Sequence, residues 1–180
     1  MVPFYMNERN GPLFRRDMLT REGKEKELYK DILALVEPMG FGLVEASRSE
    51  HSGYVSLRVL ISAGDREVNT DDLEKVYNII YPRYQVLIGR DLELEVSSPG
   101  LQRVIKDTLE FRVFLGKSVR VYSNEHSCYV IGKIAEATDD ELTLDEYLIE
   151  DKGETGERIT LAYADIAKAK LEYRWEEGRK

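Results

Sequence analysis

The sequence has a single cysteine, Cys128, and only two histidines, His51 and His126. One cysteine cannot form an internal disulfide, and no cysteine and histidine spacing typical of a metal site is present. No Gly-x-Ser-x-Gly elbow surrounds a serine, and no glycine-rich phosphate loop is followed by Lys-Ser or Lys-Thr. The sequence therefore favours a binding protein over an enzyme, with no catalytic residue, no metal and no cofactor.

Long apolar runs are also missing. No run approaches the length of a membrane span, and the first residues lack the apolar core of a secretion signal. The lone cysteine is typical of a protein in a reducing compartment. We expect a soluble, cytoplasmic monomer with no membrane partner and no small-molecule substrate.

A basic excess is absent as well, because the formal net charge is −8. Nucleic-acid binders usually carry surplus positive charge that displaces counterions from phosphates, so any RNA contact must be local. Acidic residues collect between positions 136 and 157, either as a solvated surface or as a surface for a strongly basic protein. The candidates for that protein contact are Glu141, Glu146 and Asp151. The candidates for RNA contact form a mostly basic interval: Arg103, Lys106, Arg112, Lys117 and Arg120.

The first half of the chain has a mixed helix and strand pattern. Apolar residues at helical intervals predict a helix over residues 23–39, and period-two alternation predicts strands over 41–48 and 54–61. A second helix begins at Asn69 or Thr70 and is expected to end at Pro82. With the strand at 92–96, this order predicts two helices on one face of a three-stranded sheet.

From Ser118 onward the pattern consists of short strands separated by turn residues. Five short, evenly spaced strands predict a small closed or nearly closed β-barrel. Their tyrosines either fill the core or stack on bases. The five predicted strands span residues 119–122, 129–137, 141–149, 158–162 and 167–175.

The sequence Ser97-Ser98-Pro99-Gly100-Leu101 separates these two patterns. Pro99 cannot donate to a strand ladder, and Gly100 is expected to adopt the positive φ of a type II turn. The hydroxyls of Ser97 and Ser98 are expected to bond to the backbone and hold this turn. A short helix is then predicted from Asp107 or Thr108 to Gly116.

The residues Glu-Val-Ser-Ser-Pro-Gly-Leu-x-Arg, followed by a Phe-containing segment and a Gly-Lys-x-Val-x-Val strand, resemble the ribosome maturation factor RimP family. The likeness extends from about Leu28 to Leu171. The family has Asp at the position of Gln102 and Pro at the position of Val104, whereas Arg103 is retained. Its members have an α+β domain followed by a small barrel of the Sm-like or SH3-like kind.

The resemblance implies an assembly factor that binds the nascent small (30S) ribosomal subunit, through rRNA or a basic ribosomal protein. The alternative is an Sm-like or SH3-like module that binds RNA or peptide outside ribosome assembly. We expect the junction residues to hold the two domains in a defined pose. The expected divisions are a loosely ordered extension (1–22), an α+β domain (23–103), a linker with a short helix (104–116) and the barrel domain (117–180).

Overall fold

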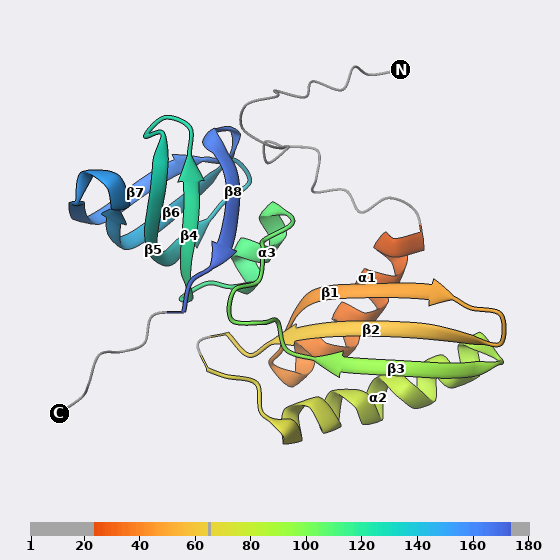
Figure 1. The fold of residues 1–180 in the computed structure, drawn as a ribbon. Helices are drawn as coiled ribbons and strands as arrows, with labels where there is room; N and C mark the ends of the chain where they lie inside the picture. The colour runs from red at the N-terminus through yellow and green to blue at the C-terminus, as the bar shows by residue number, and fades with distance from the viewer. Residues whose placement is uncertain (1–23, 65, 174–180) are drawn as a thin grey trace, which may run out of the picture. The chain divides into compact units, whose positions relative to one another are not determined.

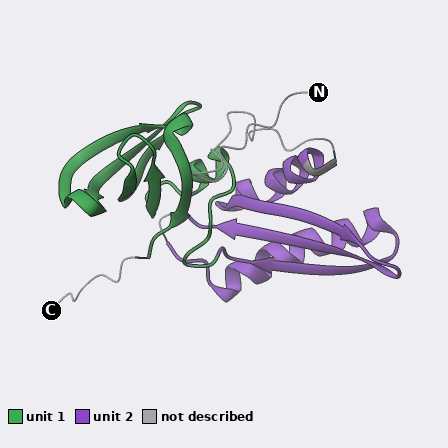
Figure 2. Cartoon of the chain, turned by 45° about the horizontal axis from the view of Figure 1, so that its top comes forward, with its two compact units in different colours: residues 1–19, 100–180 green, residues 20–99 purple. Residues whose placement is uncertain are grey.

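The computed structural model describes residues 24–64 and 66–173, which form two compact units (Figures 1 and 2). The first unit ends at Pro99, and the second begins at Gly100. Each unit has its own sheet, with three strands in the first and five in the second. The predicted extension, residues 1–22, lies outside the described residues.

The first unit has the predicted order of helix, strand, strand, helix and strand. β1 pairs with β2 as an antiparallel hairpin, and β2 pairs with β3 in parallel. A parallel pair needs a crossover connection, and the second helix provides it. The elements are α1 (Lys24–Val36), followed by a 3-10 turn (Glu37–Met39), β1 (Gly42–Glu50), β2 (Tyr54–Ser62), α2 (Thr70–Ile88) and β3 (Asp91–Ser97).

The core of the first unit lies between the sheet and both helices. Alternate side chains of β2, Leu57, Val59 and Ile61, are fully buried, as period-two patterning requires. They share one apolar cluster with Ile32 of α1 and Ile80 of α2. Both helices therefore cover the same face of the sheet.

The second helix continues beyond Pro82, so the prediction that Pro82 ends it is wrong. α2 stops only at Gly89, which has a φ of 67°. Proline removes one helical hydrogen bond, but Pro82 is exposed, so water can solvate the carbonyl left without a partner. Burial of Ile80 and Tyr84 on either side of Pro82 keeps the helix docked.

The second unit is an antiparallel sheet with one short helix. The strand order is β7-β6-β5-β4-β8. 3-10 turns follow β6 (Glu150–Lys152) and β7 (Tyr163–Asp165). The elements are α3 (Thr108–Val113), β4 (Ser118–Ser123), β5 (Cys128–Ala137), β6 (Glu141–Ile149), β7 (Glu154–Ala162) and β8 (Ile166–Leu171).

The five strands do not close into a hydrogen-bonded barrel. β7 and β8 are the outer strands, and no pairing joins them within the described residues. Part of the free edge of β8 is occupied instead, because Val104 forms an antiparallel bridge with Lys170. The α+β class is thus confirmed, whereas the predicted closed barrel is not.

The short helix α3 packs on this five-stranded sheet. Phe111 is fully buried and stacks on Tyr163, with the ring centroids 5.6 Å apart. Burial of Tyr163 raises the pKa of its hydroxyl to about 12. The region after the junction is thereby tied into the core of the second unit.

Candidate functional site

The chain leaves β3 through residues 98–100 and turns at residues 100–103. The amide of Arg103 donates a hydrogen bond of 3.0 Å to the carbonyl oxygen of Gly100, so the closed turn lies around Leu101 and Gln102. Gly100 does not have a positive φ, and the predicted type II conformation at Pro99 and Gly100 is therefore wrong. Glycine at this position is not required by the backbone.

The two serines of the turn do not hold it in the predicted way. The hydroxyl of Ser97 donates to the carboxylate of Glu95 over 3.4 Å, at the exposed surface. Ser98 is exposed, and no side-chain hydrogen bond of Ser98 is found among the described residues. The turn is set by the backbone and by the residues that follow it.

The Gly100→Val variant is accordingly expected to fold normally. An added Cβ at Gly100 meets nothing within 4 Å, so the free energy of unfolding should stay within about 0.5 kcal/mol of the wild-type value. Gly116→Val is the matched control, because Gly116 has a φ of 82° and valine there should cost at least 1–2 kcal/mol or so. Urea titrations compare them, and equal losses would contradict the observed turn.

Residues 103–105 form an extra piece of strand along β8. The amide of Leu171 donates to the carbonyl of Arg103 over 2.8 Å, and the amide of Ile105 donates to the carbonyl of Ala169 over 2.9 Å. The side chain of Ile105 is 2% exposed. The stretch that leaves the junction is thus fixed to the second unit by backbone bonds and by burial.

Arg103 is held in a buried ion pair with Glu110 of α3. Its Nε donates to Oε2 over 2.9 Å and its Nη2 to Oε1 over 2.7 Å, which is the bidentate geometry of a strong pair. The side chains are 10% and 1% exposed. Burial raises the pKa of Glu110, and the Arg103 guanidinium opposes that rise. Asp107 caps the same helix by accepting from the Glu110 amide over 3.0 Å.

Comparisons with known proteins bear on this junction. Residues 32–102 match the family model described as the RimP N-terminal domain. A protein of Borrelia hermsii named "Ribosome maturation factor RimP" is 23% identical over 145 residues, which cover 81% of this chain and 94% of the relative. Both comparisons support a relation to the RimP family.

Two junction residues of this chain differ from the pattern expected for the RimP family. Gln102 is exposed at the centre of the turn, where it makes no buried contact. Val104 is 63% exposed, and the backbone bonds to β8 run through Arg103 and Ile105 instead. A proline at position 104 would therefore fit the same pairing, because it would remove no donor used there.

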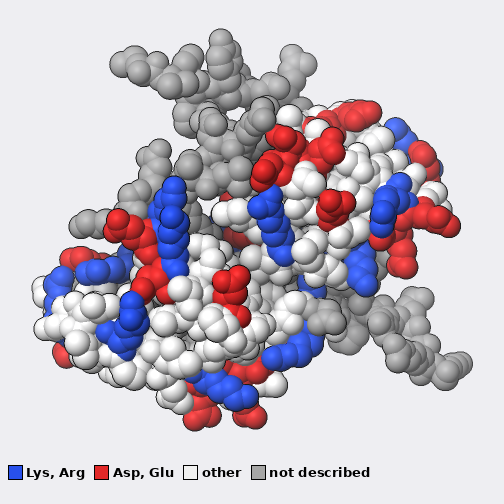
Figure 3. Space-filling model, turned by 180° about the vertical axis from the view of Figure 1, so that it is seen from behind, with Lys and Arg blue, Asp and Glu red and all other residues white. Residues whose placement is uncertain are grey.

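The other candidate RNA contacts lie in and around α3 and β4. Arg112 pairs with Asp139, and Arg120 pairs with Glu150, whose hydrogen bond raises the pKa of Arg120. Lys106 is exposed and Lys117 is half-buried. On the face seen in Figure 3, basic and acidic side chains are interspersed over most of the surface, and acidic side chains gather at the upper right. The arginines among the five basic candidates thus each pair with a carboxylate of the same chain.

Two tyrosines predicted as core or stacking residues lie on the outer face of the second sheet. Tyr122 and Tyr129 contact edge to face, with centroids 5.1 Å apart, and both are only half-buried. The Arg120 guanidinium lies 3.8 Å from the Tyr129 ring centroid, and Lys168 lies within 6 Å of both rings. Sequence reasoning missed Lys168, although the alternating lysines of β8 are a usable signal.

The acidic candidates are also spread out. Glu141 begins β6, and Glu146 interrupts the same strand with a φ of 51°, which is uncommon for a residue other than glycine. Five strand residues span about 17 Å. Asp151 lies in the 3-10 turn beyond the strand. These three exposed carboxylates cannot meet one small ligand together.

Two negative findings hold for the described residues. They contain no group of three or more His, Cys, Asp or Glu side chains arranged to hold a metal ion. No helix among them combines the length and apolar character needed to cross a membrane.

Proposed function

We propose that this chain is a maturation factor of the small ribosomal subunit that acts by binding the nascent particle, without chemistry. The observation that carries this proposal is the similarity over 94% of the length of a relative named "Ribosome maturation factor RimP". The proposal extends that relative's named role to this chain and adds the choice of subunit. Its site of action is the cytoplasm, and its active form is a monomer.

The proposed rRNA contacts are the basic side chains that reach solvent around the junction: Lys106, Arg112, Lys117 and Arg120. The buried pair of Arg103 with Glu110 favours a positioning role for Arg103. Arg112 and Arg120 each pair with a carboxylate of the same chain, so a phosphate contact requires them to share or exchange that partner. Glu141, Glu146 and Asp151 are the proposed contacts with a basic ribosomal protein.

Co-sedimentation tests the proposal. The chain should pellet with free small subunits, and it should be absent from translating ribosomes. Binding to both, or to neither while RNA or peptide is still bound, would favour the alternative of a binding module outside ribosome assembly.

Salt dependence separates RNA contact from protein contact. If Lys106 meets a phosphate, Lys106→Gln should reduce the log-log salt slope of subunit binding by roughly 0.7–0.9. Lys75→Gln, on the exposed side of α2, removes the same charge outside the basic interval and should leave the slope unchanged. Equal slopes in wild type and Lys106→Gln would exclude Lys106 as a phosphate contact.

The acidic contacts need a separate measurement. Asp151→Lys should weaken binding to an isolated basic ribosomal protein by about two- to fivefold, which corresponds to one exposed ion pair and its reversal. Asp71→Lys in the first turn of α2 is the matched control. If Asp151→Lys binds with unchanged affinity, Asp151 is not a contact with the ribosomal protein and is only a solvated surface residue.

A further inference from the structure

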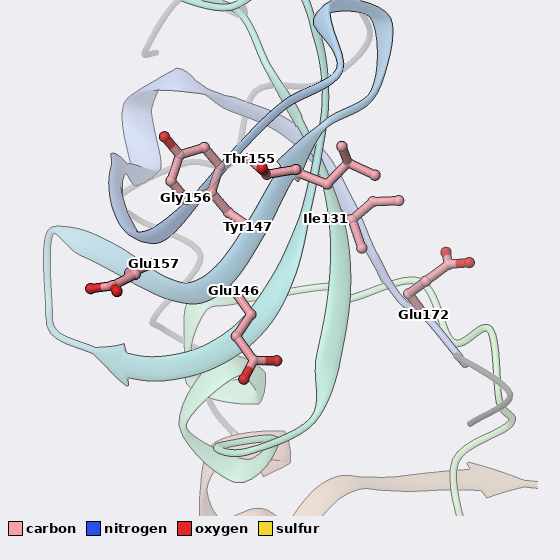
Figure 4. Close-up of a pocket in the computed structure, with 8 residues that line it drawn as sticks. Ile131, Glu146, Tyr147, Thr155, Gly156, Glu157 and Glu172 are labelled. Carbon is pink, nitrogen blue, oxygen red and sulfur yellow. The ribbon is translucent and has the colours of Figure 1, made fainter. Parts of the chain in front are cut away.

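An open pocket of about 630 Å³ lies on the second unit, where β6 and β7 run side by side (Figure 4). It lies beside the bulge that Glu146 makes in β6. β7 is an outer strand of the sheet, so an extended segment can run next to the pocket. Its lining residues are Ile131, Glu146, Tyr147, Leu148, Thr155, Gly156, Glu157 and Glu172.

The floor of the pocket is apolar and fixed in shape. Ile131 and Leu148 are direct cross-strand neighbours on β5 and β6. The Tyr147 ring packs on Gly156 so closely that an added Cβ there would lie 2.5 Å from a ring carbon. Only glycine permits this approach, which holds the aromatic ring beside the aliphatic pair.

The rim carries three carboxylates and no basic side chain among the lining residues. In Figure 4, Glu146, Glu157 and Glu172 lie on three different sides of Tyr147 and Ile131. Oε2 of Glu172 is buried and has no hydrogen-bond donor among the described residues. The Nζ of Lys170 is 3.7 Å from that oxygen, which is an ion pair without a hydrogen bond. Oε2 of Glu172 is therefore ion-paired with Lys170 but accepts no hydrogen bond from the described residues.

We propose that the pocket binds an arginine side chain from an extended, basic segment of a partner protein. The methylene stem would lie on Ile131 and Leu148, and the guanidinium would donate to Glu172. Arginine suits an apolar floor with a carboxylate rim, because its stem is apolar and its head is planar and weakly hydrated. Neighbouring basic residues of the segment meet Glu146 and Glu157. This inference deepens the proposed function, and it rests on that function for the source of the segment, a basic ribosomal protein.

The test uses the full chain, labelled with ¹⁵N, and a capped peptide of alternating arginine and valine. The expected result is a set of saturable amide shifts at Ile131, Leu148 and Gly156. The same peptide with citrulline in place of arginine keeps the shape but lacks the charge. Its affinity should be lower by about tenfold or more.

Matched variants locate the contact. Glu172→Gln and Leu148→Thr should each weaken peptide binding about two- to fivefold. Glu125→Gln, in the exposed turn between β4 and β5, removes the same charge outside the pocket and should bind normally. The amide spectrum of each variant is compared with that of the wild type to check that the fold is intact. Shifts spread over the whole acidic surface, or equal losses in Glu125→Gln and Glu172→Gln, would overturn the proposal.

Two further measurements distinguish a protein ligand from an RNA ligand, and distinguish failure of this inference from failure of the proposed function. An oligouridine that displaces the peptide and shifts the same pocket amides would also overturn the proposal, because it would identify the ligand as RNA. Loss of peptide binding with normal co-sedimentation on free small subunits removes the pocket inference and leaves the proposed function. Peptide binding without co-sedimentation supports the pocket and removes the proposed function.

Discussion

Arg103→Met is expected to lower the free energy of unfolding of the second unit by about 3–5 kcal/mol, because it leaves the carboxylate of Glu110 buried without its partner. Calorimetry of the full chain should show a lower transition for the second unit and an unchanged one for the first. The exposed pair of Arg112 with Asp139 is the control, since Arg112→Met should change stability by only about 0–1 kcal/mol.

The double variant Arg103→Met with Glu110→Leu isolates the cause. Replacing both charges by apolar groups removes the unpaired carboxylate, so most of the lost stability should return. A double variant as unstable as Arg103→Met would contradict the assignment, because packing and not charge would then explain the loss.

The loss of unfolding free energy caused by Arg103→Met should also depend on pH. Burial raises the pKa of Glu110 in the folded chain, and removing Arg103 raises that pKa further. The folded state then keeps a proton that the unfolded state has already released, so stability falls as pH rises above the unfolded value of about 4.3. Unfolding measured at pH 5 and pH 8 should show the larger deficit at pH 8.

The second large effect concerns where the second unit begins. We expect residues 100–173 to give a cooperative thermal transition on their own, whereas residues 108–173 should not. The shorter fragment lacks the partner of Glu110, the buried Ile105, the Asp107 cap and both backbone bonds to β8. Their combined loss exceeds the roughly 5 kcal/mol that makes many small domains stable.

Fragment 102–173 is the control, because it omits only the exposed Gly100 and Leu101 and should melt like fragment 100–173. Residues 24–99 should unfold independently, since their core contains residues of the first unit only. Cooperative unfolding of fragment 108–173 would show that residues 104–107 are linker, as the sequence-based domain divisions have it.

Much of the fold follows from hydrophobic periodicity. The alternation of Val55, Leu57 and Val59 fixed both the strand and its buried face, and Asn69 marked the start of α2 correctly. Periodicity cannot show which strands pair, so neither the parallel pairing of β2 with β3 nor the open β7 edge could be predicted from sequence.

The errors have physical causes. Proline is a helix breaker by local propensity, but tertiary burial beside Pro82 overrode that preference. Residues 154–157 are polar, so the start of β7 was missed, although the strand pairs with β6 from Glu154 onward. Within the candidate site, Arg103 was predicted as a surface contact because nothing in the sequence marks Glu110 as its buried partner.

The pairing of residues 103–105 with β8 also constrains folding during synthesis. The first and last segments of the second unit lie side by side, so this unit cannot be completed until Leu171 has been added to the chain. The first unit needs nothing beyond β3 and can fold earlier. At typical elongation rates, residues 100–171 take roughly 4 to 14 s to synthesise. β4 to β6 are complete at Ile149, so their apolar face lacks its closing strand while residues 150–171 are added, which takes roughly 1 to 4 s.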